Sequence, residues 1–394
     1  MSKENIKICS ACGTSNVNHN LMFLSSLFEE TIGKIGEIFI NLKKSQSIAN
    51  FTEKKLHKIL SILGITKYNN NIEKASSLRS KLIWEEAKKR GIKMEQVVIF
   101  GRHIEQYRAI INGKMFYFQS LPIPPWLPQD GYAWIDNKFK LFKKLSEAKI
   151  PIPKTKNIFT LKSLKENFKI LQKPIILKPK NGSRGRHTTT NINTEKELED
   201  AFYLTRKITP FMVAQEHLSG SVYRATVINY KLVGFFRADL PSVVGDGLKT
   251  IKDLITEKNN HKNEKISQIL INDELINFIK RQGYNLKSIP EKNLIINLIA
   301  KTGRNYGGYT KEILGDIHPK MHIIFEYTSR LISAPVLGFD LIIEDPTIDP
   351  DTMKWGIIEC NSLPFIDLHY FALEGNKINL APRVWDLWSI PLDQ

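Results

Sequence analysis

The sequence predicts an α/β (α+β) protein with more than one lobe, and three observations support this fold class. Short apolar runs typical of buried strands alternate with amphipathic stretches of helical period along the 394 residues. Neighbouring apolar runs are joined by tight turns, most clearly at Asn112-Gly113, which favours a β-hairpin. Four prolines within residues 122–129 interrupt the pattern and predict a linker between lobes. A chain of this length can bury two or three separate cores.

The composition predicts a cytoplasmic protein without a membrane span. Hydrophobic residues make up 42% and charged residues 25% of the chain, as in ordinary globular domains. No apolar run reaches the length that a membrane helix needs, and the first residues lack the pattern of a secretory signal. Three cysteines without an even framework suit a reducing compartment.

The formal net charge of +17 raises the question of a nucleic-acid partner. The lysines are scattered among isoleucines and asparagines, a mixture that an A+T-rich genome also produces. We therefore interpret the charge as background composition with a local excess that serves an anionic ligand. A basic nucleic-acid-binding protein is the least favoured alternative.

Residues 1–75 are expected to form an amino-terminal helical extension. Cys9 and Cys12 form a single Cys-x-x-Cys pair, and His19 lies nearby in the sequence. A structural zinc site needs a fourth ligand, so no metal is expected here. Apolar residues recur at helical spacing over 21–42 with charged residues between them, which indicates an amphipathic helix. Its expected partner is the main body or a second subunit of a homo-oligomer.

Residues 76–133 are expected to form a small α/β lobe. A helix over 80–90 ends at Gly91, which favours the left-handed conformation that often ends a helix. A strand over 97–100 and the Asn-Gly hairpin complete the pattern.

The stretch from residue 175 to residue 187 is the one around which the rest of the chain is organised. A short apolar strand ends at Lys178 and enters a loop that contains Gly182, Ser183, Arg184 and Gly185. Glycine lets the backbone approach a ligand closely, and exposed N–H groups can then cradle phosphate oxygens. Lys178 would add a positive charge to the same phosphates. Taken alone, the stretch also describes a basic surface turn, and the flanking motifs decide between the two interpretations.

The order of the motifs resembles the ATP-grasp ligases, which include D-alanine–D-alanine ligase, glutathione synthetases and cyanophycin synthetase. A basic helix expected over 136–148, with Asp136 as its N-cap, carries Lys138 thirteen residues before Pro151. The resemblance implies that Lys138 and Lys178 are the two phosphate-binding lysines of an ATP site. It also implies that the glycine-rich loop covers the phosphates.

The segment over residues 211–220 resembles the hinge of that family. The resemblance implies that the backbone here binds the adenine edge, and the candidate residues are Gln215, Glu216, His217 and Leu218. The family usually places an acidic residue after the hinge glycine to bind ribose, whereas this chain has Val222. Arg224 and Arg237 follow in a predicted hairpin, where guanidinium groups would suit a carboxylate or a phosphate.

Two further segments narrow the resemblance to cyanophycin synthetase and the ligase domain of bifunctional glutathione synthetase. They are residues 243–255 and the inserted helical piece over 278–290. Downstream, the family has an arginine and then Asn-x-Ser-Thr-Gly-Gly, and this chain keeps only the two glycines.

Ile299 stands at the place of the missing arginine and Gly303 at the place of the asparagine. Lys301 and Arg304 are the candidates to compensate for that arginine. Because of this departure, the identity of the substrates cannot be carried over from the family.

Two carboxyl-terminal strands carry the predicted metal site. Glu359 and Asn361 are two residues apart on one strand, so their side chains share a face, and Asp340 lies on the neighbouring strand. Such oxygen ligands suit Mg²⁺, with Mn²⁺ as an alternative. The same spacing also occurs in any half-exposed strand, but the match to the family's Asp…Glu-x-Asn favours the metal. The aspartates between these strands predict a hairpin tip, not a calcium loop.

The resemblance implies an ATP-dependent carboxylate–amine ligase that works through an acylphosphate and releases ADP and phosphate. Its partners would be ATP and a small amino-acid or peptide substrate. The expected domains are an extension (1–75), a lobe before the ATP-grasp fold (76–133), an amino-terminal ATP-grasp subdomain (134–210) and a carboxyl-terminal one (211–394). The chain has no Walker loop and no second ligase domain, so a stand-alone protein is expected. The alternative is a non-catalytic ATP-binding module, which the departures at Val222, Ile299 and Gly303 suggest.

Overall fold

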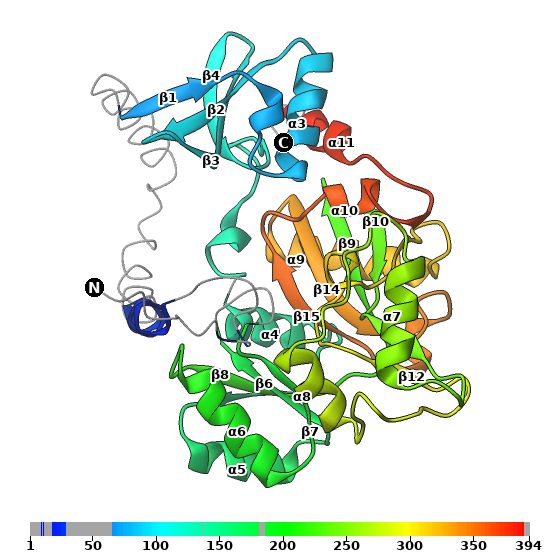
Figure 1. Ribbon diagram of the computed structural model, residues 1–394. Coiled ribbons are helices and arrows are strands. Elements are labelled where there is room, and N and C mark those ends of the chain that lie inside the picture. The colour runs from blue at the N-terminus through cyan, green and yellow to red at the C-terminus, as the bar shows by residue number, and fades with distance from the viewer. Residues whose placement is uncertain are drawn as a thin grey trace, which may run out of the picture.

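The computed structural model describes residues 9, 11, 18–28, 65–135, 137–180 and 186–389, and this part of the chain contains three larger sheets and a two-stranded one, with their helices (Figure 1). The four-stranded sheet of the first lobe stands at the top of the view, a second four-stranded sheet at the bottom, and a six-stranded sheet between them on the right. The helix predicted over 21–42 is present over residues 19–28, and its remainder lies outside the described residues. Within the described part of the chain, no helix combines the length and apolar character that a membrane crossing requires.

The first lobe contains an antiparallel sheet in the order β1-β2-β3-β4. Its strands are β1 (Thr66–Asn69), β2 (Lys93–Ile99), β3 (Arg102–Ile111) and β4 (Lys114–Gln119). Helix α3 (Leu78–Lys89) begins at Ser77, whose side chain accepts a hydrogen bond from the Ser80 N–H. The predicted hairpin is confirmed, because Asn112 and Gly113 both have positive φ between β3 and β4. The lobe starts at Thr66, ten residues before the predicted boundary at 76.

The end of the chain completes the core of this first lobe. Helix α11 (Ala381–Asp386) packs on α3, and both belong to one apolar cluster with β2, β3 and β4. Trp385 is 1% exposed, and its indole Nε1–H donates to the carbonyl of Ile83 over 2.9 Å. Figure 1 shows α11 beside α3, above the six-stranded sheet. The division at 211–394 therefore needs a correction, since its last helix belongs to the first lobe.

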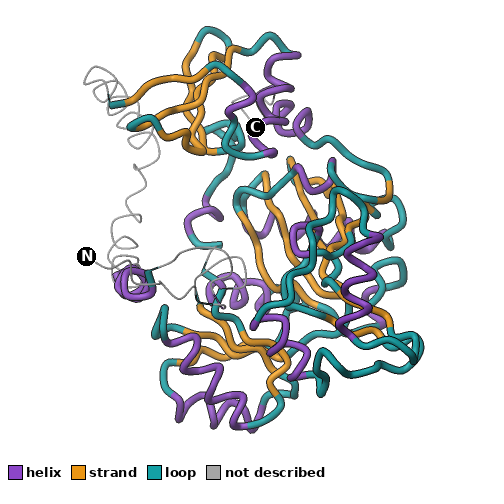
Figure 2. The backbone as a smooth tube through the Cα atoms, viewed as in Figure 1, coloured by secondary structure: helices purple, strands orange, loops and turns teal. Residues whose placement is uncertain are grey.

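The second sheet is antiparallel and has the order β5-β8-β6-β7. Its strands are β5 (Thr155–Ile158), β6 (Ile175–Pro179), β7 (Thr189–Ile192) and β8 (Met212–Glu216). Helices α5 (Leu161–Ile170) and α6 (Glu195–Arg206) cover the lower side of this sheet in Figure 2. Thr194 and Glu197 form a reciprocal capping box at the start of α6.

Strand β8 corrects the predicted boundary at residue 210. It was assigned to the carboxyl-terminal subdomain, yet it pairs with β5 on one side and β6 on the other. All five of its residues are buried, which a central strand requires. The amino-terminal subdomain therefore extends through Glu216.

The third sheet has the order β15-β14-β9-β10-β13-β16 and supports the predicted metal ligands. Its strands are β9 (Ser221–Ile228), β10 (Lys231–Ala238), β13 (Thr310–Glu312), β14 (Val336–Ile343), β15 (Gly356–Asn361) and β16 (Glu374–Gly375). Helix α9 (Pro319–Ile332) and helix α4 (Lys138–Glu147) pack on this sheet in one apolar core. Short helix α10 (Asp367–Tyr370) lies against β10.

Helix α4 is fixed by its apolar face. Leu141, Phe142 and Leu145 are buried among the aromatic and aliphatic residues of the third sheet. The helix begins at Lys138, where Asn137 accepts a hydrogen bond from the Lys140 N–H through its side chain over 3.2 Å. The predicted N-cap Asp136 lies outside the described residues. Packing of α4 therefore places Lys138 at the edge of the sheet that carries the predicted metal ligands.

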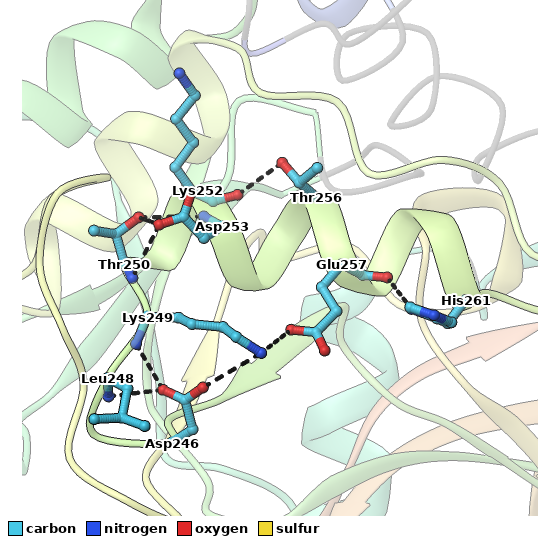
Figure 3. A network of polar contacts seen from close by, with 9 residues as sticks. All are labelled: Asp246, Leu248, Lys249, Thr250, Lys252, Asp253, Thr256, Glu257 and His261. Atoms are coloured by element: carbon cyan, nitrogen blue, oxygen red, sulfur yellow. Dashed lines mark hydrogen bonds and ion pairs between the residues drawn. The ribbon is translucent and has the colours of Figure 1, made fainter.

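A smaller unit is inserted between β10 and β13. It contains the two-stranded sheet β11 (Ser242–Val244) and β12 (Ile295–Asn297), with α7 (Ile251–His261) and α8 (Asp273–Arg281) around its own apolar core. Figure 3 shows how α7 begins, with Thr250 and Asp253 in a reciprocal capping box. In the same figure, Lys249 pairs with Glu257 over 2.7 Å across the first turns of the helix.

Candidate active site

A cavity of about 780 Å³ is lined jointly by the second sheet, the third sheet and the inserted unit. Strands β6 and β7 contribute from the second sheet, and β9, β10, β14 and β15 contribute from the third. Helices α7 and α8 and strand β12 contribute from the inserted unit. Pockets of this size hold small-molecule ligands and cofactors.

The cavity is strongly electropositive. Among the described residues that line it, six are basic and two are acidic. The basic ones are Lys138, Lys178, Arg186, Arg237, Lys258 and Arg281, and the acidic ones are Asp239 and Glu359. Such a concentration of positive charge between apolar walls favours a polyanionic ligand.

The two predicted phosphate-binding lysines meet in this cavity. Lys138 comes from the first turn of α4 and Lys178 from β6, forty residues later. Loss of solvation and the nearby charge of Lys138 lower the pKa of Lys178 to about 7. Lys138 lies 3.6 Å from Glu359, measured from Nζ to Oε1. A bound anion would relieve the repulsion between the two ammonium groups.

Arg224, Asp340 and Glu359 form a row across three neighbouring strands. Arg224 on β9 lies opposite Asp340 on β14, which in turn lies opposite Glu359 on β15. The guanidinium of Arg224 holds both oxygens of Asp340, through Nε to Oδ1 and through Nη2 to Oδ2 at 2.8 Å. The sequence predicted that the two carboxylates would be neighbours, and the structure confirms it.

Only part of the hydrogen-bonding capacity of Arg224 is used within this row. The buried Nη1 of Arg224 makes no hydrogen bond within the described residues. Burial raises the pKa of the Asp340 carboxyl and Glu359 raises it further, while Arg224 acts in the opposite direction. The row can therefore accept both an additional cation beside the carboxylates and an anionic group beside Arg224.

The predicted metal ligands fit a hard divalent cation. Asn361 lies on β15, and its Nδ2–H donates to Asp340 Oδ2 over 3.4 Å. Asp340, Glu359 and Asn361 thus offer only oxygen ligands at one edge of the sheet, which matches the preference of Mg²⁺. Glu359 also lines the cavity, so an ion held here would face the ligand of the cavity.

The predicted adenine hinge contributes two of its four residues to the cavity wall. His217 and Leu218 line the cavity. Gln215 is buried and donates from Nε2 to Thr155 Oγ1 over 2.8 Å. Glu216 pairs with Lys354 over 3.2 Å. The N–H groups of Glu216 and His217 donate to backbone carbonyls of the chain, at 3.1 and 3.0 Å.

The glycine-rich loop itself lies outside the described residues. This concerns the predicted phosphate ligands Gly182, Ser183, Arg184 and Gly185. Its two ends are described, at Lys180 and at Arg186, and Arg186 lines the cavity.

Of the remaining predicted catalytic residues, Arg237 reaches the cavity and two others are engaged elsewhere. Arg237 lines the cavity, and its Nε–H donates to Asp239 over 2.7 Å. Lys301 pairs with Glu274 on α8 over 2.9 Å. Arg304 donates to the Phe371 carbonyl over 3.5 Å and packs over the ring of that residue. The structure therefore does not bring Lys301 or Arg304 together with the predicted metal ligands.

The two glycines that the chain shares with the family, Gly307 and Gly308, have a steric reason. Gly307 has φ +90°, and an added Cβ would stand 2.3 Å from Ile269 Cγ1. Gly308 approaches β10 so closely that an added Cβ would stand 2.1 Å from the Asp239 carbonyl oxygen. Gly303 has φ +90°, and its N–H donates to the same carbonyl over 3.0 Å. This loop therefore packs its backbone directly against the cavity wall beside Asp239.

Three residues of the cavity wall were missed by the sequence analysis. Arg281 lies at the end of α8, and its buried Nε has no hydrogen-bond partner within the described residues. Tyr309 also lines the cavity with a buried hydroxyl that lacks such a partner there. Lys258 on α7 donates to the Ser242 carbonyl over 2.5 Å. Arg281 lies within the family-like segment 278–290, but the sequence did not indicate that this segment faces the cavity. The tertiary placement of the inserted unit reveals the position of all three residues.

Residues 135–235 match the sequence profile of the ATP-grasp domain. The match spans both lysines and the hinge, so the chain contains an ATP-grasp domain, as its motifs predicted. A crystal structure of a bifunctional glutathione synthetase from Pasteurella multocida aligns with a TM-score of 0.55 and 20% identity. The alignment covers 80% of this chain and 44% of that one, and it confirms the predicted fold.

Two curated relatives share part of the sequence. A cyanophycin synthetase from Geminocystis herdmanii is 29% identical over 252 residues, which cover 62% of this chain and 29% of the relative. A bifunctional glutathione biosynthesis protein from Clostridium perfringens is 27% identical over 266 residues, which cover 64% of this chain and 34% of the relative. The chain thus spans about a third of the length of these relatives.

Proposed function

We propose that this chain binds ATP in the cavity and uses it to join a carboxylate to an amine. The excess of basic over acidic side chains around a cavity of about 780 Å³ is the observation that carries the proposal. An ATP triphosphate supplies the negative charge that these groups require, and its nucleoside suits the apolar side chains of the cavity wall, which include Leu218 and Ile342. The similarity to a cyanophycin synthetase and to a bifunctional glutathione biosynthesis protein supports a ligase of this kind.

Each group of residues has a proposed role in holding ATP. Lys138, Lys178 and Arg186 neutralise the phosphates together with the glycine-rich loop. His217 and Leu218 hold the adenine from the hinge. Arg237 also lines the cavity and would contact the reacting carboxylate, whereas Arg224 holds Asp340 and is not among the residues that line the cavity.

Asp340, Glu359 and Asn361 would hold Mg²⁺, with Mn²⁺ as an alternative. When bound, such an ion neutralises charge on the transferring phosphoryl group. The chain supports this role through Arg224, which fixes the orientation of the Asp340 carboxylate by a two-point contact.

The proposed reaction has two steps, phosphorylation of the carboxylate and attack by the amine. A carboxylate oxygen of the first substrate attacks the γ-phosphorus, and the bond between that phosphorus and the bridging oxygen of ADP breaks. The nitrogen of the amine substrate then attacks the carbonyl carbon of the acylphosphate, phosphate leaves, and the nitrogen gives up a proton to form the amide. The cavity would align these groups and stabilise the charge that moves during each step.

We assign the substrate contacts to residues of the cavity wall and not to Lys301 and Arg304, the predicted replacements for the family's arginine. Arg237, Arg281 and Tyr309 line the cavity, whereas Lys301 and Arg304 are bonded to other parts of the chain. Guanidinium groups and a hydroxyl donor suit the carboxylate of a small amino acid or peptide.

A non-catalytic ATP-binding module is the second candidate. The engagement of Lys301 with Glu274 and of Arg304 with the Phe371 carbonyl favours it, because both predicted replacements for the family's arginine are then bonded elsewhere. The two candidates differ in turnover and not in ATP binding.

A screen for ADP release across pairs of amino acids and short peptides tests the proposal. We expect ADP formation that requires both a carboxylate and an amine substrate. Lys138→Ala should lower this turnover about 100- to 1,000-fold, the usual effect of removing one preorganised charged group. Lys143→Ala is the matched control, since Lys143 lies on the same helix with its side chain 67% exposed. Saturable ATP binding without substrate-dependent ADP release would establish the non-catalytic module instead.

A further inference from the structure

A cluster of metal-binding residue types lies outside the cavity, where the start of the chain meets the end of the glycine-rich loop. Cys9, His19 and His187 each offer one ligand atom, and these atoms all lie within 4.8 Å of one another. His187 is 168 residues away from His19 in the sequence, so only the fold brings the three together. The expectation that no metal binds near Cys9 considered sequence neighbours alone and did not include His187.

The spacing of the ligand atoms suits a single tetrahedral ion. The distance between Cys9 Sγ and His187 Nε2 is 3.8 Å. Zinc–sulfur and zinc–nitrogen bonds of ordinary length, placed at a tetrahedral angle, would separate these two atoms by about 3.6 Å. The rings of His19 and His187 meet edge to face with centroids 4.9 Å apart, so both can present a nitrogen to the same space.

The orientation of His187 is fixed by the surrounding backbone. Its Nδ1–H donates to the Leu204 carbonyl over 2.7 Å, which leaves Nε2 as the nitrogen that faces Cys9. Metal-binding histidines commonly donate their second ring N–H in this way, because the contact fixes the tautomer and the ring. The His187 side chain is 1% exposed, so a ligand atom here is shielded from solvent.

Hydrogen bonds also fix the backbone N–H and carbonyl groups of His187. The His187 N–H donates to the Ala11 carbonyl over 3.1 Å, and Thr205 Oγ1–H donates to the His187 carbonyl over 2.9 Å. Ala11 is two residues from Cys9, so these contacts bring the cysteine and the histidine together independently of any ion.

We propose that Cys9, His19 and His187 supply three of the four ligands of a zinc site that ties the amino-terminal segment to the end of the glycine-rich loop, with a water molecule or a further side chain as the fourth. Zinc accepts both thiolate and imidazole ligands, whereas Mg²⁺ and Ca²⁺ prefer oxygen ligands. Cys12 has the Cys-x-x-Cys spacing of an additional thiolate ligand, but it lies outside the described residues and the proposal does not depend on it. Because Arg186 lines the cavity next to His187, the site would also support one wall of the cavity.

The proposal predicts that the full chain binds about one zinc ion. Zinc should be measured by elemental analysis of the purified protein, and again after a chelator has removed it and zinc has been restored. The chelated wild-type protein should then be titrated with Co²⁺. A sulfur-to-cobalt charge-transfer band together with the intense visible bands of a tetrahedral ion is expected.

Cys9→Ser and His187→Gln should each weaken zinc binding by at least about tenfold. His261→Gln is the matched control, since His261 also donates its Nδ1–H to a backbone carbonyl, over 2.9 Å, but stands on an exposed helix. This control should keep the zinc of the wild-type protein.

Failure of the wild-type chain to bind stoichiometric zinc after chelation and resupply would overturn the proposal. Retention of the metal in both Cys9→Ser and His187→Gln would do so too. If a variant does not fold, the cobalt spectrum of the wild-type protein decides, and a spectrum without a thiolate band would overturn the proposal. None of these readouts depends on ATP or on ligase activity, so the zinc site and the proposed function stand or fall separately.

Discussion

At the scale of single residues, the row of Arg224, Asp340 and Glu359 distinguishes two carboxylates that look alike in the sequence. Asp340 is bonded at both oxygens to a buried guanidinium, whereas Glu359 lies 3.6 Å from Lys138 and lines the cavity. Neutralising Asp340 leaves a charge buried without its partner, which is costly. Neutralising Glu359 removes charge from the cavity and leaves the fold intact. The two substitutions should therefore differ in stability even if both abolish turnover.

Glu359→Gln is expected to lower ADP formation about 100- to 1,000-fold, because it removes one of the two negative charges that would face the metal ion. Its free energy of unfolding should change by no more than about 1 kcal/mol, since the contact with Lys138 is loose and partly exposed. Metal-dependent ADP release and thermal melting should be measured side by side. Undiminished turnover in this variant would remove Glu359 from the metal site.

Asp340→Asn should lose turnover to a similar degree and also lose about 3 kcal/mol of stability, because Arg224 then keeps a buried charge. Asp351→Asn is the matched control in the hairpin tip. Its carboxylate is 73% exposed, and Lys320 retains a second partner in Asp349. We expect wild-type turnover and melting for this control, and an equally stable Asp340→Asn would contradict the importance of the Arg224 contact.

Lys178 gives the site a pH dependence whose sign follows from its lowered pKa. Its pKa of about 7 lies below the usual value of 10.5, so above pH 7 the empty cavity holds a neutral amine. A bound phosphate favours the charged ammonium, so ATP binding above pH 7 must take up a proton. Affinity for ATP should therefore fall as pH rises from 7 to 9, by at most about tenfold per pH unit.

Calorimetric titrations with ATP in two buffers of different ionisation enthalpy will measure this proton uptake. Lys178→Met is the control, because a side chain without a titrating group should bind ATP more weakly and without the additional uptake. Equal proton uptake by the wild-type protein and Lys178→Met would show that another group titrates.

At the scale of helices and strands, local signals in the sequence predicted the elements well. The Asn112-Gly113 hairpin is confirmed, because turn conformation depends on a few adjacent residues. The strands of Asp340 and Glu359 were predicted to be neighbours, and their antiparallel pairing places these two residues opposite each other. Boundaries were predicted less well, since strand β8 is assigned by its pairing partners and not by its own residues.

Helix α11 shows what local signals cannot reveal. Its six residues carry no signal for their partner, yet Trp385 completes the core of a lobe built about 270 residues earlier in the chain. The cavity residues Arg281 and Tyr309 were missed for the same reason, because their position depends on how the inserted unit packs. Motifs made of residues close together in the sequence could be recognised. Contacts between segments far apart in the sequence could not be predicted.

Trp385→Ala should lower the free energy of unfolding by about 3–5 kcal/mol, the usual cost of removing a large aromatic side chain from a core. The indole is 1% exposed, and its loss also leaves the Ile83 carbonyl without this donor. Denaturant unfolding provides the measurement. Tyr327→Ala on α9 is the control, since its side chain is 51% exposed and should change stability by no more than about 0.5 kcal/mol. Similar stability of the two variants would mean that α11 is not part of the first core.

At the scale of the whole molecule, the cavity and the core of the first lobe lie at opposite ends of two shared strands. The cavity wall includes Ser221 and Val222 at the start of β9 and Ile342 near the end of β14. The first core joins β2, β3, β4, α3 and α11 to Ile228 at the end of β9 and Val336 at the start of β14. A ligand that binds only the folded cavity stabilises the protein in proportion to the logarithm of its concentration. A substitution in the core of the first lobe should lower the stability of the ligand-free protein. It should not change the stabilisation by the ligand, because distant sites contribute additively to the free energy of unfolding.

We therefore predict that ATP with Mg²⁺, at about 100 times its dissociation constant, raises the free energy of unfolding by about 2.7 kcal/mol. AMP at the same concentration should raise it much less, because the phosphates that would contact Lys138 and Lys178 are missing. Without nucleotide, Trp385→Ala should be less stable than the wild-type protein, and ATP should stabilise it by the full amount. Lys138→Ala should have nearly wild-type stability without nucleotide, and ATP should stabilise it much less. Denaturant unfolding of the three proteins with and without each nucleotide is the measurement.

Equal stabilisation by AMP and ATP would show that the basic groups do not hold the phosphates. Loss of the increment in Trp385→Ala would show that the cavity depends on the first lobe, in which case the two parts form one cooperative unit.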